Sequence, residues 1–170
     1  KADTRSTMIS MIQDSVNMII DKYCDNKKVS EAEYEDIKKE IEVLVFGIKS
    51  PDYTPGMTKK DLSELYIEAA KNKYCDRERE WPDINMFGEF ERQIILRCID
   101  VKWMQHINDL EILRQNISLV GYGQKDPAIV YKLKAFDMFN KMSDDIKNDA
   151  VYTLFSSRLR TAAPKRDTAA

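Results

Sequence analysis

Residues 85–117 read NMFGEFERQIILRCIDVKWMQHINDLEILRQNI, and residues 127–157 read PAIVYKLKAFDMFNKMSDDIKNDAVYTLFSS. Apolar residues recur every three or four positions in both stretches, which predicts two long amphipathic helices. A helix over residues 85–117 would be about 50 Å long. A compact globule of this chain length would be only about 40 Å across. The helices are therefore expected to project beyond a compact core.

The nine residues between these stretches read SLVGYGQKD and predict a tight reversal. Gly121 and Gly123 flank Tyr122, while Asp126 and Pro127 suit the N-cap and first position of the next helix. Two long helices joined by a short loop should pack antiparallel, with Tyr122 at the exposed end. A tyrosine ring suits contact with varied partners. The alternative is that the ring folds back onto its own hairpin.

Three shorter helices are predicted upstream, over residues 4–23, 30–46 and 58–74. Ser30 and Glu33 have the spacing of a capping box at the start of the second. Gly47 suits the left-handed conformation that ends it. Residues 48–57 hold two prolines and a glycine, and read as the longest internal loop.

The composition agrees with an all-α fold and narrows the function. The 170 residues include only five glycines and five prolines, and 43% are hydrophobic, which excludes collagen-like and low-complexity classes. Charged residues are spread along the chain and leave no room for a membrane span. A net charge of −2 argues against a nucleic-acid partner. Three cysteines without close pairing, and no visible signal peptide, fit a reducing cytoplasm.

Catalytic signatures do not emerge from the sequence. There is no GxxxxGK[ST] loop to hold a nucleotide phosphate, so neither an enzyme nor a cofactor is expected within these residues. His106 is the only histidine, which argues against a multi-histidine metal site, and we expect no metal. It lies three residues after Trp103 and three before Asp109, so the three side chains could stack along one helix edge. An enzyme built around His106 is a weaker alternative to a packing role for this histidine.

One pattern is specific enough to indicate a family. Residues 99–107 (IDVKWMQHI), 113–117 (LRQNI) and 121–127 (GYGQKDP), followed by Tyr131 and Lys132, resemble the C-terminal region of SecA, the ATP-driven motor of bacterial protein export. The family pattern is D-x-x-W-x-x-H, then L-R-x-x-I, then G-Y-x-Q-x-D-P-x-x-x-Y-K, in this order. The strong match covers residues 90–139, and the upstream segment fits by its order of helices.

The resemblance implies a domain organisation and a set of functional residues. Residues 1–25 would end a scaffold helix, 26–84 would form the helical wing, 85–160 the two-helix finger of the helical scaffold, and 161–170 a tail or linker. The finger tip would be formed by Leu119, Val120, Gly121, Tyr122, Gly123, Gln124 and Lys125. The finger's structural residues would be Trp103, His106, Arg114, Asp126, Pro127 and Tyr131. Trp103 and His106 would fasten the finger to its neighbouring helices.

The resemblance also implies partners. In the family the finger enters the cytoplasmic mouth of the SecYEG channel, and its tip tyrosine, here Tyr122, contacts the unfolded preprotein. ATP and Mg²⁺ would be bound by the parent chain, whose nucleotide-binding and preprotein-binding domains lie N-terminal to these residues. The finger also regulates the ATPase in this family. The location implied is cytoplasmic, with peripheral attachment to the inner face of the membrane through the channel.

Two departures distinguish this sequence from the common family pattern. Ser118, Leu119 and Val120 stand where the family commonly has H-L-R, and Ala162-Ala163-Pro164 replaces the cysteine-rich zinc-binding tail. These differences suggest a divergent, accessory SecA paralogue. The alternative from another class is a free-standing helical adaptor that binds a partner helix through exposed apolar residues.

Overall fold

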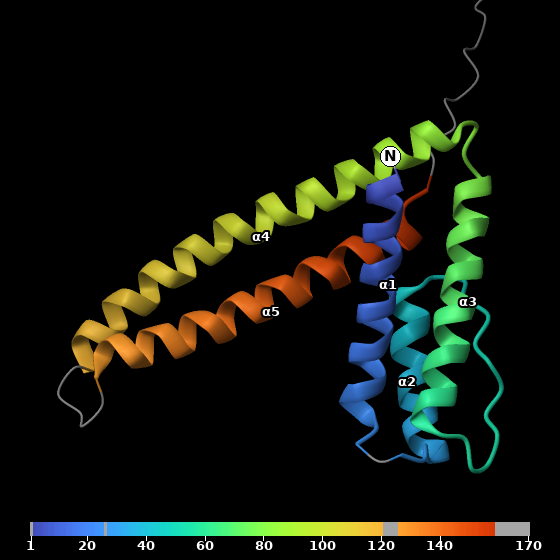
Figure 1. Cartoon of the computed structure of the whole chain (residues 1–170), viewed down its shortest axis with the longest axis horizontal. Coiled ribbons are helices and arrows are strands. Elements are labelled where there is room, and N and C mark those ends of the chain that lie inside the picture. The colour runs from blue at the N-terminus through green and yellow to red at the C-terminus, as the bar shows by residue number, and fades with distance from the viewer. Residues whose placement is uncertain (1, 26, 121–125, 159–170) are drawn as a thin grey trace, which may run out of the picture.

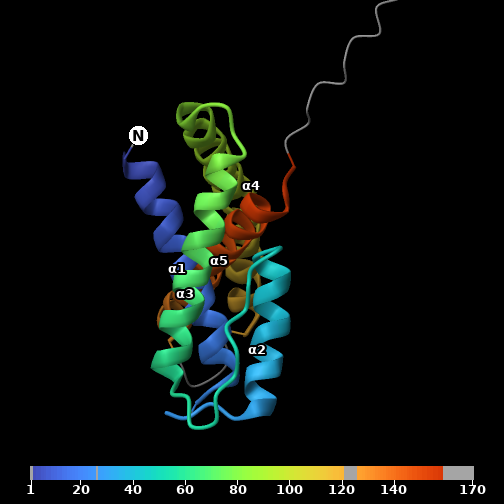
Figure 2. The ribbon, with the colours of Figure 1, turned by 90° about the vertical axis from the view of Figure 1, so that its right-hand side faces the viewer.

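The computed structural model describes residues 2–25, 27–120 and 126–158, and these confirm the all-α class. Five helices lie in the described ranges: α1 (Ala2–Tyr23), α2 (Glu31–Leu44), α3 (Lys59–Arg79), α4 (Ile84–Val120) and α5 (Pro127–Ser156). The three shorter helices lie side by side as a bundle (Figures 1 and 2). The two longer helices form a hairpin that extends away from the bundle (Figure 1).

The starts of the second and third predicted helices, α2 and α3, have complete capping boxes. The Ser30 hydroxyl accepts from the Glu33 backbone N–H, and the Glu33 carboxylate accepts from the Ser30 N–H at 2.9 Å. Thr58 and Asp61 make the same reciprocal pair at the start of α3. Gly47 has a φ of +79°, the left-handed conformation that favours glycine after a helix.

Backbone and tyrosine hydrogen bonds hold the loop at residues 48–57 against the bundle. The Val29 N–H donates to the Met57 carbonyl at 2.9 Å, beside an isolated antiparallel bridge between Lys28 and Thr58. The Tyr34 hydroxyl donates to the Pro51 carbonyl at 2.5 Å. These bonds satisfy polar groups of a segment that has no helix of its own.

The core lies where the hairpin meets the bundle, and α1 is its central helix. Met8, Ile12, Val16 and Ile20 recur on one face of α1 and are fully or almost fully buried. The C-terminal turns of α5 pack against this face through Ala150, Val151, Leu154 and Phe155. Burying each large aliphatic side chain of this kind contributes about 1.5–3 kcal/mol. One end of the hairpin is thus built into the core.

Two helix ends differ from the expected boundaries. The second helix ends at Leu44 rather than at residue 46. The third continues to Arg79 rather than stopping near residue 74, because Arg77 extends its buried face for another turn. The long helices cover 84–120 and 127–156, close to the expected 85–117 and 127–157.

Candidate functional site

The far end of the hairpin is the part that the sequence analysis singled out. Helix α4 ends at Val120, and Leu119 in its last turn is 78% exposed. Gly121, Tyr122, Gly123, Gln124 and Lys125 lie outside the described residues. The described helix ends on either side of them are the points of the hairpin farthest from the bundle (Figure 1).

Asp126 and Pro127 start the return helix as their residue types suggest. The Asp126 carboxylate accepts from the Ala128 backbone N–H at 3.0 Å, and Pro127 occupies the first helical position. This cap satisfies one of the free N–H donors at the start of α5. Asp126 and Pro127 therefore fix where the helical part of the hairpin resumes.

Arg114 and Tyr131 lie on facing helices near this end. Arg114 forms a two-point ion pair with Glu111 one turn earlier, with Nη2 to Oε1 at 2.8 Å and Nε to Oε2 at 3.2 Å. The hydrogen bond from Arg114 lowers the pKa of the Glu111 carboxyl. Tyr131 is half-buried in the hairpin. The Arg114 pair lies on the surface of α4, where such pairs contribute little stability.

His106 and Trp103 lie nearer the middle of the hairpin. His106 is only 6% exposed, and its ring meets the Phe139 ring edge-on with centroids 6.1 Å apart. Trp103 lies 5.7 Å from the His106 ring but remains 47% exposed. His106 thus packs between the two helices of the hairpin, whereas Trp103 covers it from outside.

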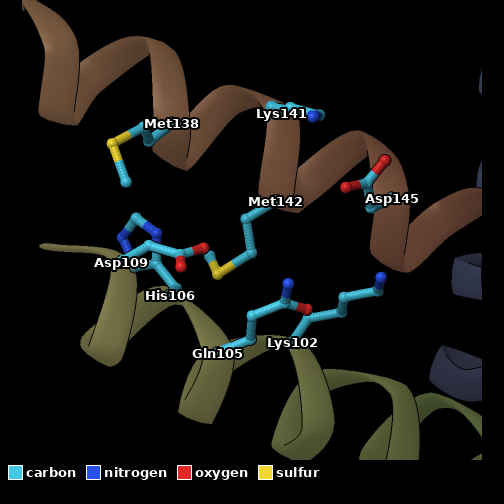
Figure 3. Close-up of a pocket in the computed structure, with 8 residues that line it drawn as sticks. All are labelled: Lys102, Gln105, His106, Asp109, Met138, Lys141, Met142 and Asp145. Atoms are coloured by element: carbon cyan, nitrogen blue, oxygen red, sulfur yellow. The ribbon is translucent and has the colours of Figure 1, made fainter. Parts of the chain in front are cut away.

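A small cleft of about 180 Å³ runs between α4 and α5 beside His106 (Figure 3). Met138 and Met142 point from α5 toward α4 and form its apolar side (Figure 3). Its charged lining residues are Lys102, Asp109, Lys141 and Asp145. The cleft is smaller than the roughly 300–1,000 Å³ of typical ligand pockets.

The charged and methionine side chains of this cleft are arranged as in ordinary packing between two helices rather than as in a catalytic site. The Lys102 ammonium lies 3.4 Å from the Asp149 carboxylate, so it links α4 to α5. Within the described ranges, no group of three or more His, Cys, Asp or Glu residues is placed to hold a metal ion. His106 lines the cleft and its ring also contacts the Phe139 ring, an arrangement that suits a packing histidine.

Comparison with known proteins then identifies the family. The family model of the SecA wing and scaffold domain matches residues 1–158, which include all five described helices. The chain belongs to the SecA wing and scaffold family. Protein translocase subunit SecA of Syntrophomonas wolfei is 33% identical over 98% of this chain. The same subunit of Caldicellulosiruptor saccharolyticus is 35% identical over 92% of it, and that of Carboxydothermus hydrogenoformans 35% over 96%.

The wing and scaffold domain is only part of these relatives. This chain spans about a fifth of their length, between 19% and 20% in the three cases above. None of the helices in the described part of the domain is both long and apolar enough to cross a membrane.

The hairpin of this SecA domain carries a strip of exposed apolar residues on both of its helices. Trp103 and Ile107 are one turn apart on α4, and Leu133, Phe136 and Phe139 follow at helical spacing on α5. All five are exposed, and the His106 ring touches both Trp103 and Phe139. The ring contacts of His106 join the Trp103 and Phe139 part of this strip across α4 and α5, and an exposed apolar surface that spans two helices suits a contact with another protein segment.

Sequence reasoning missed the polar contacts at the root of the hairpin. Glu91 is 1% exposed, and the Tyr74 hydroxyl donates to its Oε1 at 2.5 Å. Arg77, 5% exposed, reaches the end of α5. One signal was available: Glu91 lies one turn from Phe87 and three residues before Ile94, so a carboxylate occupies an apolar face. Arg77 lay within a mixed-charge run that is typical of a solvated surface.

Proposed function

We propose that this chain is the non-catalytic wing and scaffold segment of an ATP-driven SecA protein translocase. Residues 1–25 would end a scaffold helix, 26–84 would form the wing, 85–160 the two-helix finger and 161–170 a tail or linker. Belonging to the wing and scaffold family supports this division. The hairpin of α4 and α5 is the feature that carries the proposal, because it holds an exposed end far from the core (Figure 1).

The finger would act on the preprotein at the mouth of the SecYEG channel and regulate the ATPase of the parent chain. Residues 119–125 would form its tip, with Tyr122 facing the polypeptide. Support comes from the exposure of Leu119, the first residue of this tip, and from the exposed apolar strip along the hairpin. Trp103, His106, Arg114, Asp126, Pro127 and Tyr131 would be the structural residues of the finger.

The other proposed partners are the domains and the ligands of the parent motor. Its nucleotide-binding domains would hold ATP and Mg²⁺, and its preprotein-binding domain would pass substrate to the finger. The protein would be cytoplasmic and attached peripherally to the membrane through the channel. The tip sequence Ser118-Leu119-Val120 has none of the basic groups common in the family, which supports an accessory role with a restricted set of substrates.

The test is Tyr122→Ala in the full-length translocase, with transport of a preprotein into channel-containing vesicles as the measurement. We expect transport to slow by about tenfold, the effect of losing one contact worth roughly 1.4 kcal/mol. Thermal unfolding should not change, since the described core lies at the opposite end of the hairpin from Val120 and Asp126. Tyr152→Ala is the matched control, because Tyr152 is an exposed tyrosine of the hairpin that lies near its root. Normal transport by the Tyr122 variant would contradict the assignment of the tip.

A free-standing helical adaptor remains the second candidate, and the apolar strip on α4 and α5 favours it. The reading frame upstream of these residues separates the two functions. Nucleotide-binding motifs in that frame support the motor, whereas a short independent frame supports the adaptor.

A further inference from the structure

The root of the hairpin contains a buried arginine with a partner for each of its guanidinium nitrogens. Arg77 lies in the last turn of α3. Its Nε donates to the Leu154 carbonyl at 3.2 Å, its Nη2 donates to the Ser157 carbonyl, and its Nη1 pairs with Glu80. Two of these three partners are backbone groups at the C-terminal end of α5. The third belongs to the end of α3 itself.

The end of α5 needs such a donor. The last four carbonyls of a helix have no partner within it, and their dipoles favour a positive charge nearby. In α5 the Ser157 N–H satisfies the Thr153 carbonyl at 3.0 Å, and the last turn of this helix contains no basic residue. Arg77 supplies the missing donor and charge from a different helix. A buried arginine thus serves as a C-cap for α5.

The same face of α3 holds the other helix of the hairpin. Tyr74 is one turn before Arg77, and its hydroxyl donates to the buried carboxylate of Glu91 on α4 at 2.5 Å. The Tyr74 ring also meets the Phe87 ring edge-on, with centroids 5.6 Å apart. Residues three apart on a helix share a face. One face of α3 therefore contacts the root of both long helices.

Other polar links at the root are more exposed. Lys147 on α5 pairs with Asp14 on α1 at 2.9 Å, and Lys102 pairs with Asp149 within the hairpin at 3.4 Å. Exposed pairs of this kind are weak because water screens them. The Arg77 side chain is buried, and its charge-assisted hydrogen bonds are buried to Leu154 and partly buried to Ser157 and Glu80, so they are the stronger directional constraint.

We propose that Arg77 and Tyr74 form a clasp through which α3 sets the direction of the hairpin relative to the bundle. When α3 is displaced, the hydrogen bonds of Arg77 move the end of α5 with it, and the hydrogen bond of Tyr74 moves the root of α4. Both are positioning residues. The clasp concerns the geometry of the hairpin root and does not rest on the proposed translocase function.

The test compares Arg77→Met with Arg79→Met. Arg79 is two residues away and exposed, and it pairs with Asp76 on the surface of α3. Spin labels on unnatural amino acids at residue 35 of α2 and residue 132 of α5 leave the three native cysteines unchanged. Both positions are exposed. Pulsed electron resonance then measures the distance distribution between the bundle and the hairpin, and hydrogen exchange reports on residues 150–157.

For Arg77→Met we expect the distance distribution to broaden by about twofold and exchange at residues 150–157 to rise about tenfold, as expected for losing a buried charged hydrogen bond. Arg79→Met should change neither. Arg77→Lys, which keeps the charge but not the forked geometry, should fall between them. Tyr74→Phe removes only a hydroxyl and tests the α4 side if Arg77→Met fails to fold. An unchanged distribution in folded Arg77→Met, or in Tyr74→Phe where the arginine variant does not fold, would overturn the clasp.

Discussion

At the scale of single residues, Glu91 shows how burial changes a side chain that looks ordinary in the sequence. Burial is the main cause that raises the pKa of its carboxyl, and the negative charge of Glu78 adds to it. The Tyr74 hydrogen bond and the Arg5 guanidinium act in the opposite direction. Arg5 itself is held 3.0 Å from Glu78 and lies over the Tyr74 ring. Side chains from α1 and α3 thus affect the pKa of a carboxyl group on α4.

The raised pKa of Glu91 predicts a pH dependence of stability. The folded state holds the proton more tightly than the unfolded state, so the contribution is fully present below the unfolded pKa and is lost as pH rises through the folded pKa. Glu91→Gln should therefore raise the free energy of unfolding at pH 7 and flatten its slope above pH 4.5. Urea unfolding at several pH values measures this. Glu68→Gln, an exposed control, should leave the slope unchanged.

At the scale of the helices, local capping residues determine where α2, α3 and α5 begin. Ser30 and Glu33 each accept a hydrogen bond from the other's backbone N–H at the start of α2. The Asp126 side chain accepts from one free backbone N–H at the start of α5. These contacts connect residues two or three positions apart. Their geometry therefore depends little on the rest of the molecule, which is why the spacing of residues in the sequence predicted them.

The cap of α2 gives a direct prediction. Ser30→Ala should lower the free energy of unfolding by about 1 kcal/mol, the typical cost of losing an N-cap side chain. Ser30→Asp should retain most of the stability, because aspartate also accepts from the free N–H groups. Urea unfolding of both variants checks the prediction. Equal loss in the two variants would show that the hydroxyl matters for a reason other than capping.

At the scale of the whole molecule, stability is concentrated where the bundle and the hairpin meet. Two leucines of α5 illustrate this: Leu154 is fully buried in the core, whereas Leu133 is exposed along the hairpin. The outer part of the hairpin has only its partner helix to pack against (Figure 1). Hydrophobic stabilisation should therefore fall along α5 from its C-terminal end toward Pro127.

A matched pair of substitutions tests this distribution. Leu154→Ala should cost about 2–5 kcal/mol, as is typical for a truncated core leucine, while Leu133→Ala should stay within about 0.5 kcal/mol of the parent. Both remove the same atoms from the same helix. Chemical unfolding of the two variants gives the difference. Similar losses would mean that the hairpin is stabilised along its full length.

The sequence by itself determined the helices, the capping residues, the length of the hairpin and the family. These depend on apolar spacing and on contacts between residues a few positions apart, which are visible in one dimension. Only the tertiary structure decided that Glu91 meets Tyr74, that Arg77 caps α5, and that Trp103 and Phe139 stay exposed. The two contacts join residues that are far apart in the sequence, and the exposure depends on which helices lie nearby. All three features depend on the angle at which the helices cross, and the pattern of residues along one helix does not specify that angle.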